Sequence, residues 1–403
     1  MNISANSKKG NNIFVSLNNK YIDDAINNGF KKIIVSKSKF KAVKSTRKYL
    51  EKYLKKYYYK QIKDVILIGV TGTNGKTSTS YLIYQALNLA GIKCSYIGTI
   101  GFYLENDIKK LNNTTPDICD LYEMIIESIN CGCKAVVMEV SSHALKLGRV
   151  NTLKFDYAIL TNITEDHLDF HKTYKDYYKT KMSIFKKLKK KGTKISDIKI
   201  ENYDINNDYF EYNNKIYNTK IKGEYNIKNI IPSIIILDKM NIDSRKIIPQ
   251  LCLPPGRMQI IKFKNNSIII DYAHTPDAME KIISTVKIMD HNKIITIFGC
   301  GGNREKEKRP KMGEIASLLS DYVILTNDNP RDENPKEIIR EIKQNMNNNY
   351  KIIYDRKKAI QEGIKMLKEN DVLLILGKGH EEYQIIDNKK IFFSDLYTVY
   401  DII

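Results

Sequence analysis

A glycine-rich turn between a predicted strand and a predicted helix carries the clearest chemistry in the sequence. Residues 68–78 read IGVTGTNGKTS, so an apolar strand runs into Gly72, Gly75, Lys76 and Thr77. A glycine loop at a helix N-terminus presents backbone N–H groups to phosphates, while the lysine reaches the outer phosphates and the threonine hydroxyl binds Mg²⁺. The spacing departs from the usual GxxxxGKT at Val70, but its context favours an ATP site over an accidental glycine turn.

Two further side chains follow predicted strands and could hold a metal ion. Glu139 comes after the apolar run AVVM and before SSH, and His167 lies in TNITEDHLDFH after the next strand. Mg²⁺ prefers oxygen ligands and keeps several waters, so one or two protein groups near the phosphates are enough. A lone histidine is more often structural, but a histidine between two aspartates after a buried strand favours a ligand.

Alternating strands and helices must position these residues. Apolar runs at 65–70, 135–140 and 157–160 are separated by helical stretches, which predicts a parallel sheet covered on both faces. Ligands of such sheets bind at the carboxyl ends of the strands. After the rigid PPGR at 254–257, five more apolar runs alternate with helical stretches and predict a second α/β unit.

The remaining segments complete the expected organisation. Residues 12–37 read as strand, helix and strand, a charged helix follows over 41–60, and residues 186–217 are rich in Lys, Asn and Tyr with weak periodicity. We expect an α/β protein of three domains. They are a small truncated N-terminal α/β domain (1–62), a central P-loop-type ATPase domain with a mostly parallel sheet (63–253), and a C-terminal Rossmann-like α/β domain (254–403).

Composition argues against several other classes of protein. The net charge is +20, but lysines are spread through nearly every segment, and the densest run, 186–194, follows a helical stretch where a solvated face is the usual explanation. We therefore expect no nucleic-acid partner. The apolar runs are too short to span a bilayer, and the first residues lack an apolar signal segment, so we expect a cytoplasmic protein without a membrane partner. The six cysteines lack metal spacing and are expected to be reduced thiols.

Nine blocks of residues, in order, resemble the Mur ligases. TGTNGKT, a glutamate after the next apolar strand and TNITEDHLD are shared across that family and with folylpolyglutamate synthetases. The chain resembles the MurE type most closely, through TTPD, MEVSSHAL, HLDFHKTYKDYYKTKMSIF, PGRM, DYAHTPDA, FGCGGNREKEKRPKMG, TNDNPRDENP and GKGHEEYQ. The resemblance covers roughly residues 65–185 and 254–395.

The resemblance implies an ATP-dependent ligase that acts in peptidoglycan precursor synthesis. MurE-type enzymes phosphorylate the glutamyl carboxylate of UDP-N-acetylmuramoyl-L-Ala-D-Glu and join the third amino acid to the acyl phosphate. ATP and Mg²⁺ are the implied cofactors, and a monomer is expected. The implied ATP-binding residues are Gly72, Thr73, Asn74, Gly75, Lys76, Thr77, Ser78, Asn162, Arg257, Asp271 and His274.

The resemblance also implies the metal site and an unusual modification. Thr77 and Glu139 would hold one Mg²⁺ and His167 a second, with Lys76, Glu139, His167 and Lys181 as the catalytic set. Lys181 matches the lysine that carries a carbamate (N6-carboxylysine) in the family. Carbamylation turns a cation into an anionic oxygen ligand, whereas an unmodified lysine would be repelled by Mg²⁺. Without the family, a solvated helical lysine is the better interpretation.

Two substrate sites follow from the same resemblance. The UDP-muramoyl dipeptide would be bound by Asn113, Thr114, Thr115, Ser141 and Arg149, while Leu147 stands where the family commonly has Gln. The amino acid would be bound by Arg304, Asp328, Asn329, Pro330, Arg331, Gly377 and Glu381. The fork of Arg331 suits a distal carboxylate, which favours meso-diaminopimelate, or an isostere such as lanthionine, over lysine or ornithine.

The sequence departs from the family in two places. The loop that carries a His-Gln-Ala contact to the uridine nucleotide is missing after FVSL, and the segment between Lys181 and Gly223 is short and lacks a recognisable N-x-DD strand. Three interpretations therefore stand: a trimmed MurE-type ligase, a related ligase for another glutamyl substrate such as folate, and a noncatalytic nucleotide-binding remnant. The intact nucleotide, metal and amino-acid motifs favour the first.

Overall fold

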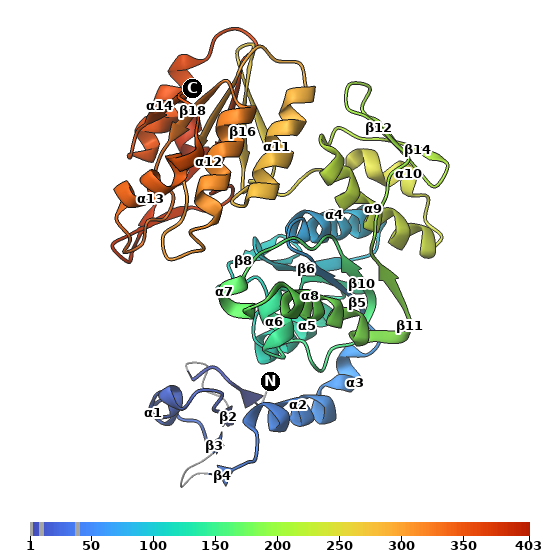
Figure 1. The fold of residues 1–403 in the computed structure, drawn as a ribbon. Coiled ribbons are helices and arrows are strands. Elements are labelled where there is room, and N and C mark those ends of the chain that lie inside the picture. Colours follow the sequence, from blue (N-terminus) through green and yellow to red (C-terminus); the bar gives the residue numbers. More distant parts are fainter. Residues whose placement is uncertain (1–2, 8–11, 37–40) are drawn as a thin grey trace. The chain divides into compact units, whose positions relative to one another are not determined.

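The computed structural model describes residues 3–7, 12–36 and 41–403 (Figure 1). Their contacts divide the chain into two compact units, each made of several segments. The first unit comprises the residues up to 72, 87–160 and 175–196, and the second comprises 73–86, 161–174 and 197–403. No described helix is long and apolar enough to cross a membrane.

The first unit begins with a small parallel sheet. Its strands are β1 (Ile3–Ser4), β2 (Ile13–Val15), β3 (Lys32–Val35) and β4 (Lys41–Ala42), with η1 (Asn19–Tyr21) and α1 (Ile22–Asn27) between β2 and β3. The predicted strand, helix and strand are confirmed. The charged helix begins later than expected, because Lys41–Ala42 pairs with β3. Ser45 caps α2 (Thr46–Tyr57) by accepting from Lys48 N, and α3 (Tyr59–Ile62) follows.

A seven-stranded sheet forms the body of the first unit, in the order β11-β10-β5-β9-β6-β7-β8. Its strands are β5 (Ile66–Thr71), β6 (Cys94–Gly98), β7 (Gly101–Leu104), β8 (Asp107–Lys109), β9 (Ala135–Glu139), β10 (Phe155–Leu160) and β11 (Leu188–Ile195). The five strands from β11 to β6 are parallel, and only β7 and β8 pair antiparallel. The predicted, mostly parallel central sheet is confirmed.

Several helices belong to the same stretch of chain. They are α4 (Lys76–Leu89), α5 (Ile118–Asn130), α6 (Ser142–Lys146), α7 (Leu168–His171), α8 (Tyr174–Met182) and η2 (Ser183–Lys187). Strand β9 is buried along its whole length, which explains its uninterrupted apolar run.

The lysine-rich segment with weak periodicity forms four strands. Lys190, Lys191 and Lys194 are exposed, as expected of a solvated run, but they lie on a strand. Strand β11 pairs in parallel with β10, with Ile195 opposite Ile159, and is the last strand at that end of the sheet. An edge strand tolerates exposed lysines, which hides it in the sequence. In the second unit β12 (Asn202–Asp204), β13 (Tyr209–Tyr212) and β14 (Lys215–Asn218) form an antiparallel sheet in which Phe210 stacks on Tyr217.

A six-stranded sheet with the order β15-β16-β20-β17-β18-β19 dominates the second unit. Its strands are β15 (Gln259–Phe263), β16 (Asn266–Asp271), β17 (Ile294–Phe298), β18 (Tyr322–Leu325), β19 (Tyr350–Ile352) and β20 (Val372–Leu376), and all but β15 run parallel. The remaining elements are α9 (Glu224–Lys239), α10 (Ser244–Ile247), η3 (Ile248–Gln250), α11 (Pro276–Ile288), α12 (Lys308–Leu319), α13 (Pro335–Ile342), η4 (Lys343–Asn345), α14 (Arg356–Met366), β21 (Tyr383–Ile386), β22 (Lys389–Phe392) and α15 (Asp395–Tyr400).

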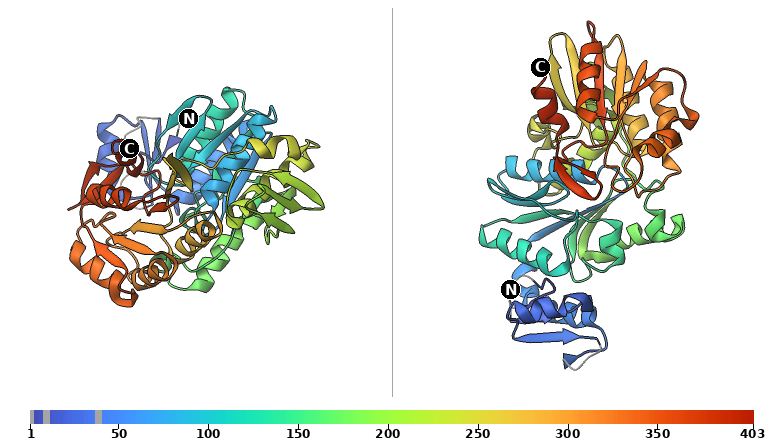
Figure 2. Two further views of the ribbon diagram at one scale, coloured as in Figure 1. Left: turned by 90° about the horizontal axis from the view of Figure 1, so that it is seen from above. Right: turned by 90° about the vertical axis from the view of Figure 1, so that its left-hand side faces the viewer.

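Alternate residues of this sheet enter two different cores. Ile269 and Leu374 pack in a cluster with residues of α11, α12 and α13, whereas Ile270 and Ile375 pack in a second cluster with residues of α14 and α15. Successive side chains of a strand point to opposite faces, so helices must cover both faces of this sheet. Figure 2 shows these helices on the two sides of the strands. This is the expected Rossmann-like α/β arrangement.

Candidate functional site

The start of the phosphate loop is held by the segment that follows β10. Thr73 N donates to Asn162 O at 2.9 Å, and Asn74 N donates to the side-chain Oδ1 of Asn162 at 3.0 Å. Asn162 returns a hydrogen bond from Nδ2 to Asn74 O at 3.1 Å, and Thr161 Oγ1 donates to the same carbonyl at 2.6 Å. Asn162 therefore holds the loop by hydrogen bonds to the backbone of Thr73 and Asn74.

Gly75 has no room for a side chain, because Asn229 lies close to it. Gly75 has φ +83°, and a Cβ there would lie 2.5 Å from Asn229 Oδ1 on α9. Thr79 donates from Oγ1 to that oxygen at 3.1 Å. Helix α4 begins at Lys76, whose Nζ donates to Thr73 O at 2.8 Å. The loop thus ends in a helix N-terminus that carries a lysine, which is the arrangement that binds phosphates.

A half-buried aspartate lies among basic side chains beside this loop. Asp166 lies 3.5 Å from the ring of His167, which adopts a left-handed backbone (φ 56°) and is 45% exposed. Burial opposes ionisation of Asp166, but the charges of His167, His274 and Lys76 outweigh it and lower the pKa. Three predicted site residues therefore influence one carboxylate.

Arg257 connects the helix start to the strand end of the six-stranded sheet. Its Nη2 lies 3.5 Å from Thr77 Oγ1, and its guanidinium lies 4.3 Å from the ring centroid of Tyr272. Tyr272 OH is 3.5 Å from Glu381 Oε1. Two long polar contacts and one contact between a guanidinium and an aromatic ring therefore lead from the phosphate loop to the predicted amino-acid site.

Asp271 holds the turn that carries Arg257. Its carboxylate accepts hydrogen bonds from Met258 N and Ala273 N, both at 2.7 Å. Burial raises the pKa of Asp271, although the positive charge of the neighbouring Arg257 acts to lower it. His274 Nδ1 lies 2.9 Å from Tyr272 O. The predicted ATP-facing residues of this turn are thus brought together.

A second polar cluster gathers most of the predicted amino-acid-binding residues. Asn329 Nδ2 donates to Glu381 Oε2 at 3.1 Å, and a Cβ on Gly377 would lie 2.8 Å from Asp328 Oδ2. Arg331 donates to the carbonyl oxygen of Gly302. Gly302 lies so close to Pro330 O that a Cβ there would collide with it. Arg304 is exposed. Burial, followed by the charge of Arg304, lowers the pKa of Arg331, although the charges of Asp328 and Glu381 act to raise it. Sequence reasoning missed Lys378, a fully buried member of this cluster within the GKGH motif.

In the first unit Glu139 is a buried carboxylate at the end of β9. Its Oε1 accepts from Thr99 N at 2.8 Å and from Tyr96 OH, and its Oε2 accepts from Thr99 Oγ1 at 3.1 Å. A Cβ on Gly98 would collide with both Glu139 Oε1 and Tyr96 OH. Several donors thus orient the carboxylate, and this suits a hard cation such as Mg²⁺.

Lys181 is buried, contrary to the solvated-lysine interpretation. It is 1% exposed, its Nζ donates to Gly72 O at 2.7 Å, and this atom lies 4.7 Å from the ring centroid of Tyr177. The tip of α8 therefore reaches the first glycine of the phosphate loop.

The predicted dipeptide-binding residues lie beside Glu139. Thr115 Oγ1 donates to Glu139 O at 2.9 Å and accepts from Ser141 N at 3.0 Å, while Arg149 Nη1 donates to Thr115 O at 2.8 Å. Thr114 Oγ1 is 3.0 Å from Thr99 Oγ1. Asn113 and Leu147 are exposed. Four of the five predicted residues are thus held in one network, of which Ser141 also caps α6.

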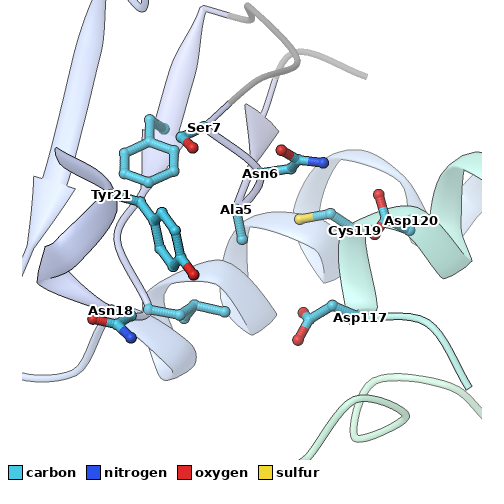
Figure 3. Close-up of a pocket in the computed structure, with 10 residues that line it drawn as sticks. Ala5, Asn6, Ser7, Asn18, Tyr21, Asp117, Cys119 and Asp120 are labelled. Atoms are coloured by element: carbon cyan, nitrogen blue, oxygen red, sulfur yellow. The ribbon is translucent and has the colours of Figure 1, made fainter. Parts of the chain in front are cut away.

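A cavity of about 350 Å³ lies between the N-terminal sheet and the start of α5, also within the first unit (Figure 3). Ser7, Asn18, Asp117 and Asp120 supply polar groups, and Tyr21 supplies an aromatic ring. Asp117 is paired with Arg47 through both carboxylate oxygens at 3.2 Å. Sequence reasoning did not identify this cavity, because its lining comes from segments that are distant in the sequence.

Two family models match parts of this chain. Residues 70–214 match the Mur ligase middle domain, and residues 256–379 match the Mur ligase glutamate ligase domain. The UDP-N-acetylmuramoyl-L-alanyl-D-glutamate–2,6-diaminopimelate ligase of Clostridium perfringens is 39% identical, covering 95% of this chain and 89% of its own. That of Aquifex aeolicus is 38% identical, covering 90% and 82%.

Solved structures are similar over nearly the whole chain. A ligase with the same name has a TM-score of 0.65 and 27% identity, covering 99% of this chain and 94% of its own. The MurF ligase of Thermotoga maritima, solved with ADP, has a TM-score of 0.65 over 93% of both chains; at 20% identity it supports the fold alone.

Proposed function

Because this chain belongs to the Mur ligase family, we propose that it is an ATP-dependent ligase that joins a diamino acid to UDP-N-acetylmuramoyl-L-alanyl-D-glutamate. The observation that carries the proposal is the run of contacts from Thr77 through Arg257 and Tyr272 to Glu381. It connects a phosphate-binding helix start with a cluster suited to an amino acid. Diaminopimelate is the proposed amine donor, as in the names of the relatives, and the reaction belongs to the cytoplasmic stage of peptidoglycan synthesis.

The proposed reaction has two steps. A carboxylate oxygen of the glutamyl residue attacks the γ-phosphorus of ATP, and ADP leaves. The amine nitrogen then attacks the acyl phosphate carbon, loses a proton, and expels phosphate. Both steps depend on positioning and on charge neutralisation. Lys76 and the N-terminus of α4 would bind the phosphates, supported by the contacts of Gly75 and Asn162 that hold the loop.

Thr77, Glu139 and His167 are the proposed magnesium-binding residues. Mg²⁺ would neutralise phosphate charge when bound. Tyr96 and Thr99 orient the Glu139 carboxylate. Lys181 is proposed to carry a carbamate: its neutral amine would add to CO₂ and release a proton. Its burial and its contact with Gly72 O support this role, because they place the amine at the phosphate loop instead of in solvent.

The remaining sites divide the substrates. Thr115, Ser141 and Arg149, with Asn113 and Thr114, are proposed to bind the muramoyl dipeptide through hydroxyl and guanidinium groups. Residues 1–62 are proposed to bind the uridine nucleotide, and the cavity beside Tyr21 has the size for part of it and a mostly apolar lining with a few polar groups. Filling the cavity with Ala5→Trp should raise the KM for the sugar nucleotide without changing that for ATP. An unchanged KM would argue against the cavity.

Phosphate release tests the proposed function. Release should require ATP, the sugar nucleotide and diaminopimelate together, and Lys76→Ala should abolish it. Release that is indifferent to the sugar nucleotide would argue against the proposal, release that instead requires a folate would favour a ligase for that glutamyl substrate, and no release at all would favour a noncatalytic remnant. Among amine donors, diaminopimelate should have a higher kcat/KM than lysine, because Arg331 would otherwise lack a carboxylate partner. Higher kcat/KM for lysine would overturn that choice.

A further inference from the structure

Lys378 lies buried at the centre of the second unit's polar cluster, after β20. Its side chain is 0% exposed, and its Nζ lies 3.2 Å from Glu381 Oε2, 3.3 Å from Asn329 Oδ1 and 4.0 Å from Asp328 Oδ1. Burying a lysine is unfavourable unless its partners compensate for lost water. These partners are themselves three of the proposed amino-acid-binding residues.

The contacts of Lys378 set the orientation of both polar side chains. Asn329 Oδ1 accepts from Lys378 and from Ile385 N at 3.0 Å, so its Nδ2 is directed to Glu381 Oε2 at 3.1 Å. Glu381 Oε2 therefore accepts from two donors. Its other oxygen, Oε1, faces Tyr272 OH at the longer distance of 3.5 Å. Oε2 is engaged by two protein donors, whereas Oε1 has only the long contact with Tyr272 and can still accept from a ligand donor.

We propose that Lys378 is a positioning and specificity-determining residue for the amine donor. It acts through Glu381, whose Oε1 it leaves oriented to accept from an ammonium group of the amino acid, and through Asn329. This inference rests on the proposed function.

Charge gives Lys378 a second effect, on the choice of amine donor. The cluster contains the basic residues Lys378, Arg304 and Arg331 and the acidic residues Asp328 and Glu381. It therefore carries more positive than negative side chains. A donor with two carboxylates suits that balance. Removing the charge of Lys378 leaves the two acidic groups less compensated. This should weaken the binding of diaminopimelate more than the binding of lysine.

Steady-state kinetics of Lys378→Met test the proposal, because methionine keeps the length of the stem without the charge. Hydrogen bonds to charged groups make the expected rise in KM for diaminopimelate about tenfold to a hundredfold. The KM for ATP should stay within about twofold. The ratio of kcat/KM for diaminopimelate over lysine should fall. Lys378→Arg should recover part of the loss.

The matched control is Lys351→Met in β19, which removes an exposed lysine paired with Glu362 and should leave both KM values unchanged. A double-mutant cycle with Glu381→Gln should be non-additive, because the lysine acts through that carboxylate. If Lys378→Met does not fold, as judged by its thermal melt, Lys378→Gln takes its place.

Three results would overturn the inference: an unchanged KM for diaminopimelate, equal rises in KM for diaminopimelate and ATP, or additive effects in the cycle. A wild-type chain that is active while the variant behaves like Lys351→Met sinks the inference alone. A wild-type chain without ligation sinks the proposed function and this inference with it.

Discussion

The Nζ atom of Lys181 lies 2.7 Å from the carbonyl oxygen of Gly72, the first glycine of the phosphate loop. The lysine is almost fully buried on α8, and its neighbours Lys179 and Lys175 on the same helix are exposed. Of these three lysines of the helix, the fold therefore brings Lys181 to the loop.

Carbamylation should be specific to Lys181. Protein equilibrated with ¹³C-bicarbonate should give a carbamate resonance that disappears in Lys181→Arg and persists in Lys179→Arg. Loss of the anionic group should lower kcat by roughly a hundredfold or more, as for other groups that stabilise transition-state charge. A resonance that survives in Lys181→Arg, or full activity of that variant, would contradict the proposal.

Gly98→Ala should displace Glu139, because the added Cβ would collide with the carboxylate and with Tyr96 OH. We expect a lower kcat, by about tenfold or more, and a higher Mg²⁺ concentration for half-maximal rate, since a small misplacement of an orienting group is costly. Gly91→Ala is the control: its Cβ meets nothing within 4 Å, so it should cost some stability through its positive φ (79°) but leave the Mg²⁺ dependence unchanged. Equal Mg²⁺ dependence in Gly98→Ala and wild type would argue against Glu139 as a ligand.

Arg356→Met should destabilise the six-stranded sheet region strongly. Arg356 Nε and Nη2 donate to Asp395 at 2.7 and 2.8 Å, both side chains are fully buried, and Nη2 also donates to Leu376 O at 3.0 Å. Breaking a buried pair leaves an uncompensated charge and costs about 3–5 kcal/mol. Hydrogen-exchange protection of amides in β16, β17 and β20 would measure this loss without contributions from other parts of the chain.

The double variant Arg356→Met with Asp395→Leu should recover most of that loss, because no charge is left buried. Lys357→Met removes only an exposed lysine near Asp401 and should change stability by less than about 1 kcal/mol. A single variant as stable as Lys357→Met would show that the buried pair contributes little.

His380 should remain neutral in the folded protein at mildly acidic pH. Burial lowers its pKa to about 3, and the charges of Arg257 and Lys378 act in the same direction. The unfolded chain takes up a proton near the ordinary pKa of about 6.5. The contribution of His380 to stability is therefore complete above pH 6.5 and is lost as the pH falls from there towards the folded-state pKa.

NMR titration of the His380 ring checks this directly, and no protonation should be seen at about pH 5. His380→Asn should also lose less stability than wild type between about pH 6.5 and pH 4, since asparagine takes up no proton on unfolding. A ring that titrates near pH 6.5 would contradict the prediction.

The sequence alone determined the parts of this protein that depend on local pattern. The strand, glycine turn and helix at Val70 to Lys76 define the phosphate loop within a few residues, and uninterrupted apolar runs define strands that are buried on both faces. The order of short motifs was enough for the family and the three-domain α/β fold, which the comparisons confirm. The domain boundaries and the roles of the site residues stay predictions.

Only the tertiary structure decided which charged residues are buried. Among 66 lysines and arginines, nothing local distinguishes Lys181, Lys378 or Arg356 from solvated neighbours, because their partners Gly72, Asn329 and Asp395 are distant in the sequence. Strand β11 escaped recognition for a related reason: an edge position lets lysines point to water, which removes the apolar pattern. Periodicity reports how a residue relates to its own helix or strand, whereas burial of a charge depends on a partner that only folding brings near.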